Sequence, residues 1–228
     1  MIATKRCPPA EGLLATGLYY VYQGERKLGE ESFQIFELPD GQGHYLQSAL
    51  VLQWPLAHTQ RITLELDPTW RYRAARLEVE AEGHLTLARY QLEGGLFTTR
   101  IEAAGRRPME LTYPWGGALW DYPSGLFAVA LSKQLTLAPG DSAPISLIRL
   151  ALPSLEPTPP LRCTSTRLFD HPHTFELGNF LVKEFAVLFQ AQELLHTWVD
   201  EVGVPLRLER YEHWELMRFD LVRYRLFH

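Results

Sequence analysis

The sequence is poor in the residues that staple small folds or anchor a chain in a membrane. Its 228 residues include two cysteines, Cys7 and Cys163, and two thiols cannot build a disulfide framework. No run approaches the roughly 18 consecutive apolar residues of a membrane-spanning helix. The first 17 residues carry Lys5 and Arg6, but no apolar stretch of about 7 to 15 residues follows them. We therefore expect no transmembrane segment, no secretion signal and a cytoplasmic location.

Positive charge is also scarce. The chain has 22 Lys and Arg against 27 Asp and Glu, a formal net charge of −5. Such a chain has no general attraction for phosphate backbones, so we expect no nucleic-acid partner. The densest basic stretch, Arg71, Arg73 and Arg76, lies beside Glu78 and Glu80. That mixture is typical of a solvent-exposed strand face.

The sequence lacks the motifs of common catalytic and metal sites. There is no Gly-x-Ser-x-Gly elbow and no glycine-rich loop leading into a helix. Cys163 has arginines nearby that could lower its pKa, but an inert, half-buried thiol is the favoured interpretation. His171 and His173 flank a proline, and the sequence places no third ligand beside them. We expect no cofactor, no metal and no catalytic residue.

What the chain has in abundance is a period of two. Apolar and polar residues alternate over 62–66, 77–81, 109–113 and 217–221, as in strands with one face in the core and the other in water. Glycine-containing turns separate such runs at regular intervals, which is typical of sequential antiparallel hairpins. The pattern predicts a mainly β protein, an antiparallel meander of about ten strands in a single domain over residues 1–228. Residues 1–16 are expected to be irregular.

Several features predict that this sheet is strongly curved. About ten strands in a meander must curl, close or split, and the apolar parity slips at Leu87-Ala88, which predicts a β-bulge. One short helix is predicted over Ser124 to Leu135, capped by Ser124. The stretch from Leu181 to Leu195 fits a helix or a buried strand equally well. The proline-rich passage 153–160 is expected to cross over on the surface.

The most unusual passage runs from Tyr113 to Gly125. It combines Tyr113, Trp115, Trp120 and Tyr122 with two glycines and two prolines, so a strand cannot continue through it. Aromatic loops of this kind often cover a pocket, because Trp and Tyr offer large apolar area with a polar group. The alternative is that the rings plug one end of the sheet. Both interpretations stay open at this point.

The order of elements resembles a known group of proteins. The phrase Leu-Asp-Pro-Thr-Trp at 66–70, an apolar strand at 145–152 and a terminal hairpin at 197–209 are similar to the glycolipid-binding family of bacterial proteins and, more broadly, to LolA-like lipoprotein carriers. The likeness extends over about two thirds of the chain, and the long N-terminal portion and the aromatic loop depart from it. It implies a half-barrel, a curved sheet wrapped on one side of a short helix, with an apolar cavity between them.

The leading hypothesis is therefore non-enzymatic binding of a lipid-like or amphipathic small molecule in the concave apolar face. Arg149 shares a face with apolar neighbours and is the favoured anchor for an anionic head group, with Arg73 as the second candidate; Arg149 could instead extend to the surface. One alternative is a small cofactor-independent enzyme, an isomerase or cyclase acting on a hydrophobic substrate. Another is a structural or partner-binding domain with a self-filled core. The concave face would carry apolar residues from several strands: Leu64, Leu77, Val79, Leu111 and Phe219.

Overall fold

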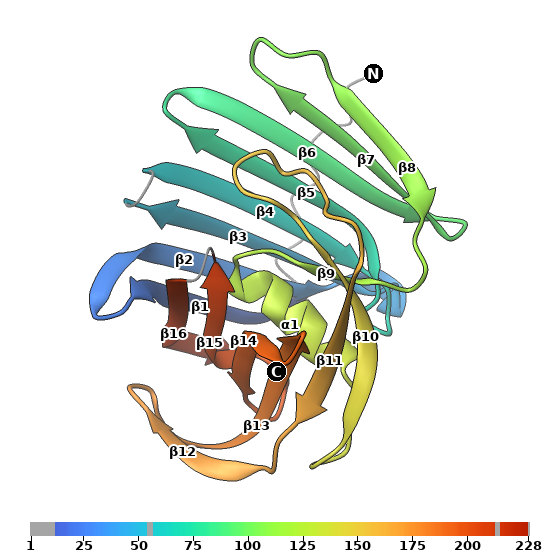
Figure 1. Cartoon of the computed structure of the whole chain (residues 1–228). Helices are drawn as coiled ribbons and strands as arrows, with labels where there is room; N and C mark the ends of the chain where they lie inside the picture. Colours follow the sequence, from blue (N-terminus) through green and yellow to red (C-terminus); the bar gives the residue numbers. More distant parts are fainter. Residues whose placement is uncertain (1–11, 54–56, 213–214, 228) are drawn as a thin grey trace.

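A single sixteen-stranded sheet dominates the computed structural model, which describes residues 12–53, 57–212 and 215–227 (Figure 1). One α-helix accompanies it, α1 (Gly125–Gln134), and a short 3-10 turn lies at Pro39–Gly41. The strands are β1 (Leu13–Gln23), β2 (Arg26–Glu37), β3 (His44–Leu52), β4 (His58–Leu66), β5 (Tyr72–Ala81), β6 (His84–Glu93), β7 (Leu96–Ala103), β8 (Met109–Pro114), β9 (Leu119–Asp121), β10 (Ser142–Arg149), β11 (Leu161–Arg167), β12 (His171–Phe175), β13 (Gly178–Phe189), β14 (Gln192–Val199), β15 (Pro205–Glu212) and β16 (Glu215–Leu226).

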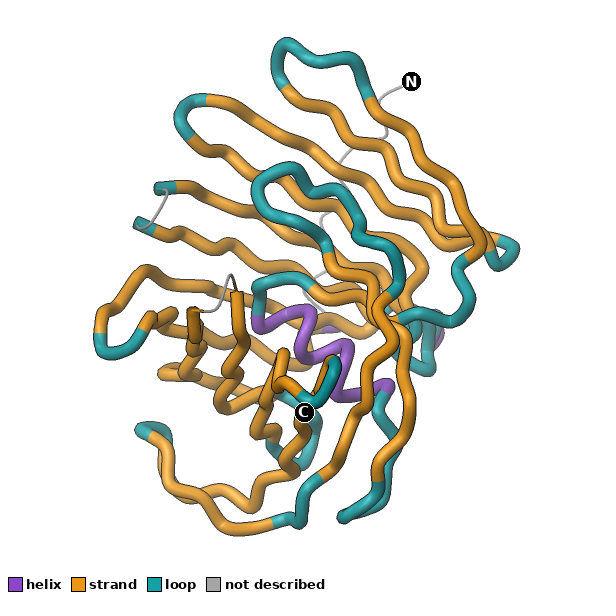
Figure 2. The backbone as a smooth tube through the Cα atoms, viewed as in Figure 1, coloured by secondary structure: helices purple, strands orange, loops and turns teal. Residues whose placement is uncertain are grey.

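The strand order confirms the predicted half-barrel, but the sheet has sixteen strands where the sequence predicted about ten. From β8 to β1 each strand pairs with the one before it, and β16, β15, β14, β13, β11, β10 and β9 continue the order on the other side of β1. All pairs are antiparallel except β9 with β10, and β12 pairs only with β13. The order ends at β8 and β9, so the sheet curls without closing (Figure 2).

Helix α1 forms where the sequence predicts it. Ser124 is extended and its hydroxyl accepts the amide of Leu126 at 3.1 Å, which caps the first turn. Residues 125–132 are buried all round the helix, as expected for a helix enclosed in a core. Figure 1 shows α1 held inside the curve of the sheet, and it contacts β3, β9 and β15. The sheet thus has an inner face toward α1 and an outer face away from it.

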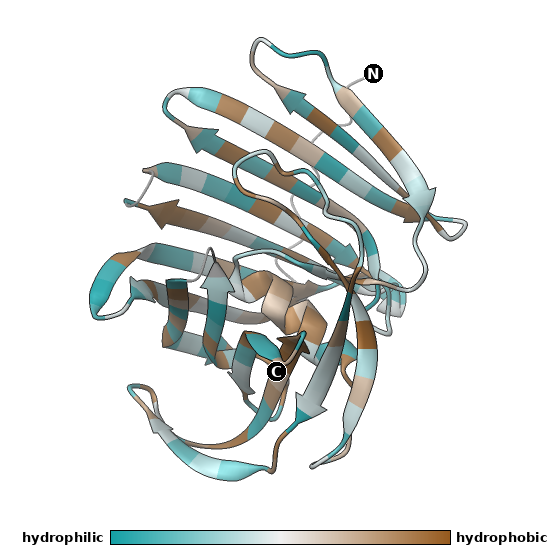
Figure 3. Cartoon of the chain, in the orientation of Figure 1, coloured by the Kyte–Doolittle hydropathy of each residue, from teal (hydrophilic) through white to brown (hydrophobic). Residues whose placement is uncertain are grey.

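The alternation of side chains along the strands follows this division (Figure 3). Leu64, Leu77, Val79 and Phe219 are buried on the inner face, as predicted. Leu111, on the end strand β8, is 38% exposed, because no further strand covers that edge. The apolar half of the pattern therefore specifies the core.

Other expectations need correction. The parity slip at Leu87-Ala88 is not a bulge: β6 keeps its register with β5 and β7 there, and the slip arises because Leu85 and Leu87 lie on the outer face. Of the two possibilities left open for the 181–195 stretch, the strand is the one observed, because the stretch lies in β13 and β14. Their turn residues Gln190 and Ala191 have positive φ angles of 50° and 63°, as a two-residue hairpin with native twist requires. Leu13–Thr16 belong to β1, and residues 1–11 of the expected irregular segment lie outside the described residues.

The proline-rich connection between β10 and β11 lies mostly at the surface, as predicted, but one of its side chains enters the core. Leu155 within it is fully buried, and the hydroxyl of Tyr90 on β6 donates to the Leu155 carbonyl. Together with α1 and β9, this connection covers the inner face of the sheet.

Candidate functional site

The concave inner face is filled by the protein's own aromatic side chains. Trp120, on β9, stacks on Tyr72 of β5 with ring centroids 4.5 Å apart, and it meets Phe97 of β7 edge-on at 4.9 Å. The Tyr72 hydroxyl donates to the Trp120 carbonyl at 3.3 Å. All three side chains are buried. The aromatic passage therefore plugs the sheet at this point.

The other aromatic candidates take part to different degrees. Tyr122 is buried against Phe127 of α1, with centroids 5.6 Å apart. Tyr113 packs half-buried on Phe97 at 5.1 Å. Trp115 is also half-buried, and its indole nitrogen donates to the Ala118 carbonyl at 2.6 Å, which holds the Gly116-Gly117 turn closed.

A buried ion cluster lies next to this plug. Asp121, directly after Trp120, accepts two hydrogen bonds from Arg210 of β15 at 3.0 and 3.1 Å and one from Arg149 of β10 at 3.1 Å. Burial by itself would raise the pKa of Asp121, but the two guanidinium charges and their hydrogen bonds outweigh it and lower that pKa. Arg149 is thus engaged by Asp121 inside the fold and does not extend freely to the surface.

A second buried carboxylate fixes the helix. Glu31 of β2 is fully buried; it accepts hydrogen bonds from the Ser124 hydroxyl and, at 2.8 Å, from the Gly125 amide at the start of α1. A carboxylate at this position complements the positive end of the helix dipole. Burial raises the pKa of Glu31, and these hydrogen bonds lower it only in part. Glu31 therefore helps hold the helix that fills the concave face.

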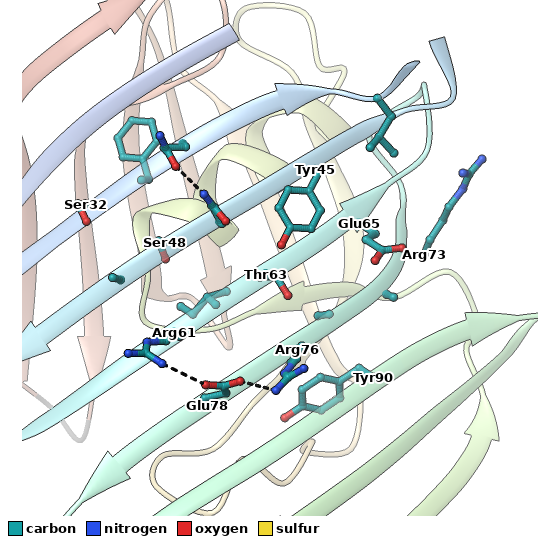
Figure 4. Close-up of a pocket in the computed structure, with 18 of the residues that line it drawn as sticks. Ser32, Tyr45, Ser48, Arg61, Thr63, Glu65, Arg73, Arg76, Glu78 and Tyr90 are labelled. Carbon is teal, nitrogen blue, oxygen red and sulfur yellow. Dashed lines mark hydrogen bonds and ion pairs between the residues drawn. The ribbon is translucent and has the colours of Figure 1, made fainter. Parts of the chain in front are cut away.

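A groove lies on the outer face of the sheet, the face that points away from α1. This open groove of about 1990 Å³ runs across the outer face of β16 and of β1 to β8, and Figure 4 shows several of its residues on that face. Two cross-strand rows form much of its floor. Arg223, Leu18, Ser32, Ala49 and Arg61 face one another in sequence on β16, β1, β2, β3 and β4. The neighbouring row holds Arg225, Thr16, Gln34, Gln47 and Thr63.

The groove is rich in positive charge, although the chain as a whole is negative. Three carboxylates line it, from Glu65, Glu78 and Glu110, against seven guanidinium groups, an excess of four positive charges. The arginines belong to five strands: Arg61, Arg73, Arg76, Arg89, Arg100, Arg223 and Arg225.

These arginines differ in how fully they are neutralised. Arg76 pairs with Glu78 at 2.5 Å, and Arg100 lies 3.2 Å from Glu110. Arg61 reaches Glu78 only at 3.9 Å and its side chain is 75% exposed. Within the described part of the chain, neither Arg73 nor Arg223 has a carboxylate at ion-pair distance.

The groove lining also includes apolar side chains. Leu38 and Pro39 follow β2, and Tyr45 lies at the start of β3; all three line the groove. We call these three residues the apolar shelf. The groove thus combines cationic and apolar surface, which is the combination that amphipathic ligands need.

The structure does not bring the six sequence-predicted site residues together. Tyr113, Trp115, Trp120 and Tyr122 lie in or beside the core plug, and Arg149 is bound to Asp121. Arg73 alone lines the outer groove.

Comparison with known proteins supports the fold. No protein-family model and no curated protein matches the chain. It is similar in structure to a β-barrel-like protein of the domain of unknown function DUF1849 from Brucella abortus, with a TM-score of 0.61, 12% identity, and coverage of 94% of this chain and 98% of that one. At that identity the likeness shows the fold alone.

Two further similarities are too weak to add to that conclusion. A DUF1089 family protein from Pseudomonas aeruginosa has a TM-score of 0.49 and 20% identity, covering 80% of this chain and 90% of that one. A domain described as an outer membrane lipoprotein-sorting protein from Vibrio parahaemolyticus has a TM-score of 0.21 and 9% identity, covering 96% and 87%.

The remaining candidates for chemistry are accounted for by local contacts. Cys163 is buried, and burial, with the Asp121 charge, raises the pKa of its thiol; Cys7 lies outside the described residues. The His171 and His173 rings are 5.9 Å apart, and His171 Nδ1 lies 3.4 Å from a Glu184 carboxylate oxygen. Over the described ranges no three His, Cys, Asp or Glu side chains gather as a metal site, and no described helix is long and apolar enough to cross a membrane.

Several residues of the buried ion cluster and of the groove were not predicted from the sequence. Asp121 and Arg210 are 89 residues apart, so no spacing connects them. Arg61 and Thr63 alternate with buried residues and could have been assigned to the outer face. Arg223 and Arg225 could not, because their orientation depends on a bulge that the sequence does not announce.

Proposed function

We propose that this protein binds an amphipathic small molecule, and that the molecule lies in the outer groove instead of the concave apolar face. The observation that carries the proposal is the contrast between the two faces. Trp120, Tyr122 and α1 occupy the concave face, while the outer face offers a groove of about 1990 Å³ with both guanidinium groups and an apolar shelf. Of the residues proposed from sequence, Arg73 is kept as a ligand contact.

The lining favours binding over catalysis. Two of the three carboxylates that line the groove, Glu78 and Glu110, are paired with arginines, so they act as counter-ions and are poorly placed to transfer protons. Hydroxyl and amide side chains such as Thr63 and Gln47 supply hydrogen bonds without acid–base chemistry.

Filling the groove tests the proposal. Ala49 is exposed on the groove floor, on β3, and Ala49→Trp should fill the space between Ser32 and Arg61. We expect this variant to lose uptake of N-phenyl-1-naphthylamine, a neutral amphipathic dye that fluoresces when it leaves water. Thr164→Trp adds the same indole to an exposed site on β11 outside the groove and should keep dye uptake. If the two variants bind the dye equally well, the ligand does not occupy the groove.

A further inference from the structure

Two sets of the groove's arginines, one on β5 to β7 and one on β16, differ in how far carboxylates of the protein neutralise them. Arg76, Arg89 and Arg100 face one another on β5, β6 and β7. Like charges directly opposite one another destabilise a sheet. Here carboxylates offset that repulsion: Arg76 pairs with Glu78, Arg89 with Glu102, and Arg100 with both Glu102 and Glu110. That row is therefore neutralised by the protein itself.

The two arginines of β16, at the edge of the groove, differ from this row. Arg223 has no carboxylate at ion-pair distance in the described part of the chain, and Arg225 lies over the Phe227 ring at 4.8 Å. Their side chains are exposed and face Leu18 and Thr16 of β1 across the groove floor. Within the described ranges, these two positive charges at the groove's edge have no carboxylate at ion-pair distance, in a chain whose net charge is −5.

A β-bulge is what brings both arginines to this face. The register between β1 and β16 shifts at Leu18/Tyr19, where Leu18 faces Arg223 and Tyr19 faces Leu221, so Val222 is the extra residue. Phe219 and Leu221 before the bulge point to the core. After it Tyr224 takes the inner position and donates to Asp200 at 2.8 Å. Bulges commonly redirect side chains in this way, and here the result is two guanidinium groups on the groove.

The spacing of the pair suits an oxyanion. Residues two apart on one strand face are separated by roughly 7 Å, so two flexible guanidinium groups can converge on a single phosphate, sulfate or carboxylate. The Phe227 ring restricts Arg225, and the Thr16 hydroxyl opposite Arg225 offers a further donor.

We propose that the ligand of the groove carries an anionic head group, a phosphate, sulfate or carboxylate, bound between Arg223 and Arg225. This inference rests on the proposed function, because it assumes that the groove takes a ligand. The inference adds the charge of that ligand and the position of its head group, between Arg223 and Arg225.

The test uses three probes with the same decyl chain, each below its micelle concentration: decyl phosphate, decyl maltoside and decyltrimethylammonium. Isothermal titration of the full chain should show decyl phosphate bound about tenfold or more tightly than decyl maltoside, since charged hydrogen bonds are each strong enough for such a factor. Decyltrimethylammonium should bind most weakly. The preference for phosphate should shrink at high salt.

Variants then locate the head group. Arg223→Gln with Arg225→Gln should weaken decyl phosphate binding about tenfold or more and leave decyl maltoside unchanged. Arg223→Lys with Arg225→Lys keeps the charge and should fall between the two. Arg162→Gln, on the exposed face of β11 outside the groove, should alter neither probe. Thermal melting of each variant confirms that it is folded.

The outcomes separate the two proposals. If decyl phosphate and decyl maltoside bind equally, and Ala49→Trp abolishes both, the groove binds amphiphiles but the anionic head is wrong. The head site is also wrong if the folded double Gln variant keeps wild-type affinity for decyl phosphate. If no probe binds, the proposed function itself fails. Inorganic phosphate identifies the source: competition supports a site for a free anion, and its absence, with decyl phosphate still bound, supports an anionic lipid-like head.

Discussion

The indole ring of Trp120 lies flat against the phenol ring of Tyr72, with the ring planes 9° from parallel. Trp120 belongs to β9, one end of the strand order, while Tyr72 belongs to β5 in the middle of the meander. The contact therefore presses a free end of the sheet onto its own inner face. The contact covers the inner face of an unclosed sheet and keeps its core buried. It also leaves little room for a ligand on the concave face.

Removing this ring should destabilise the fold. Trp120→Ala is expected to lower the free energy of unfolding by about 3–5 kcal/mol, the usual cost of deleting a buried aromatic side chain. Trp115→Ala should cost clearly less, because Trp115 is only half-buried. Urea denaturation followed by circular dichroism measures both, with Thr164→Ala as an exposed control. A loss below about 1 kcal/mol for Trp120→Ala would show that this passage is a lid and not part of the core.

The buried ion cluster makes a separate prediction. Asp121→Asn keeps the shape of the side chain but leaves Arg210 and Arg149 without their shared counter-charge. Removing one partner of a buried pair costs about 3–5 kcal/mol, and we expect a loss of that size at neutral pH.

The acid dependence of this loss has a definite sign. The folded state lowers the pKa of Asp121 below its ordinary value of 3.8, so the carboxylate's contribution is complete above that value. It disappears as the pH falls through the lowered pKa. The stability gap between wild type and Asp121→Asn, from urea denaturation at several pH values, should therefore narrow only below about pH 3.8. A gap that is already small at pH 7 would contradict the assigned role.

Sequence reasoning succeeded where the signal is local. The period of two identified the inner-face residues Leu64, Leu77 and Val79, and Ser124 marked the start of α1, because each depends on neighbours within a few residues. It failed where distant strands decide the result. The apolar Leu85 and Leu87 suggested a bulge that does not form, whereas the bulge that does form at Val222 depends on pairing between the distant strands β1 and β16.

The candidate site was harder to predict for the same reason. The rich aromatic content around Trp120 is consistent with a pocket cover or with a core plug, because large rings pack in a core as readily as they line a pocket. Arg73, Arg61 and Arg223 lie far apart in the sequence, and only the register of the sheet places them on one groove. Nothing in their separate neighbourhoods distinguishes them from ordinary exposed arginines.

Glu31 predicts a pH dependence opposite to that of Asp121. Burial raises the pKa of Glu31 above its ordinary value of 4.5, so the folded state holds its proton to higher pH than the unfolded chain. Ionisation of Glu31 therefore reduces stability as the pH rises from about 4.5 through the raised folded-state value. Glu31→Gln removes this titration. The stability of wild type relative to Glu31→Gln should therefore fall as the pH rises above about 4.5, as measured by urea denaturation at several pH values; a rise would refute the assignment.

The apolar shelf predicts how binding depends on chain length. Each methylene group contributes up to about 0.8 kcal/mol when it is fully buried, and the shelf is partly open. Decyl phosphate should therefore bind about three- to tenfold more tightly than octyl phosphate. Tyr45→Ala removes the aromatic ring of the apolar shelf, which lines the groove, so it should reduce that ratio. Gln91→Ala alters a polar groove residue on β6, and it should preserve the ratio. An unchanged ratio in folded Tyr45→Ala would place the alkyl chain elsewhere in the groove.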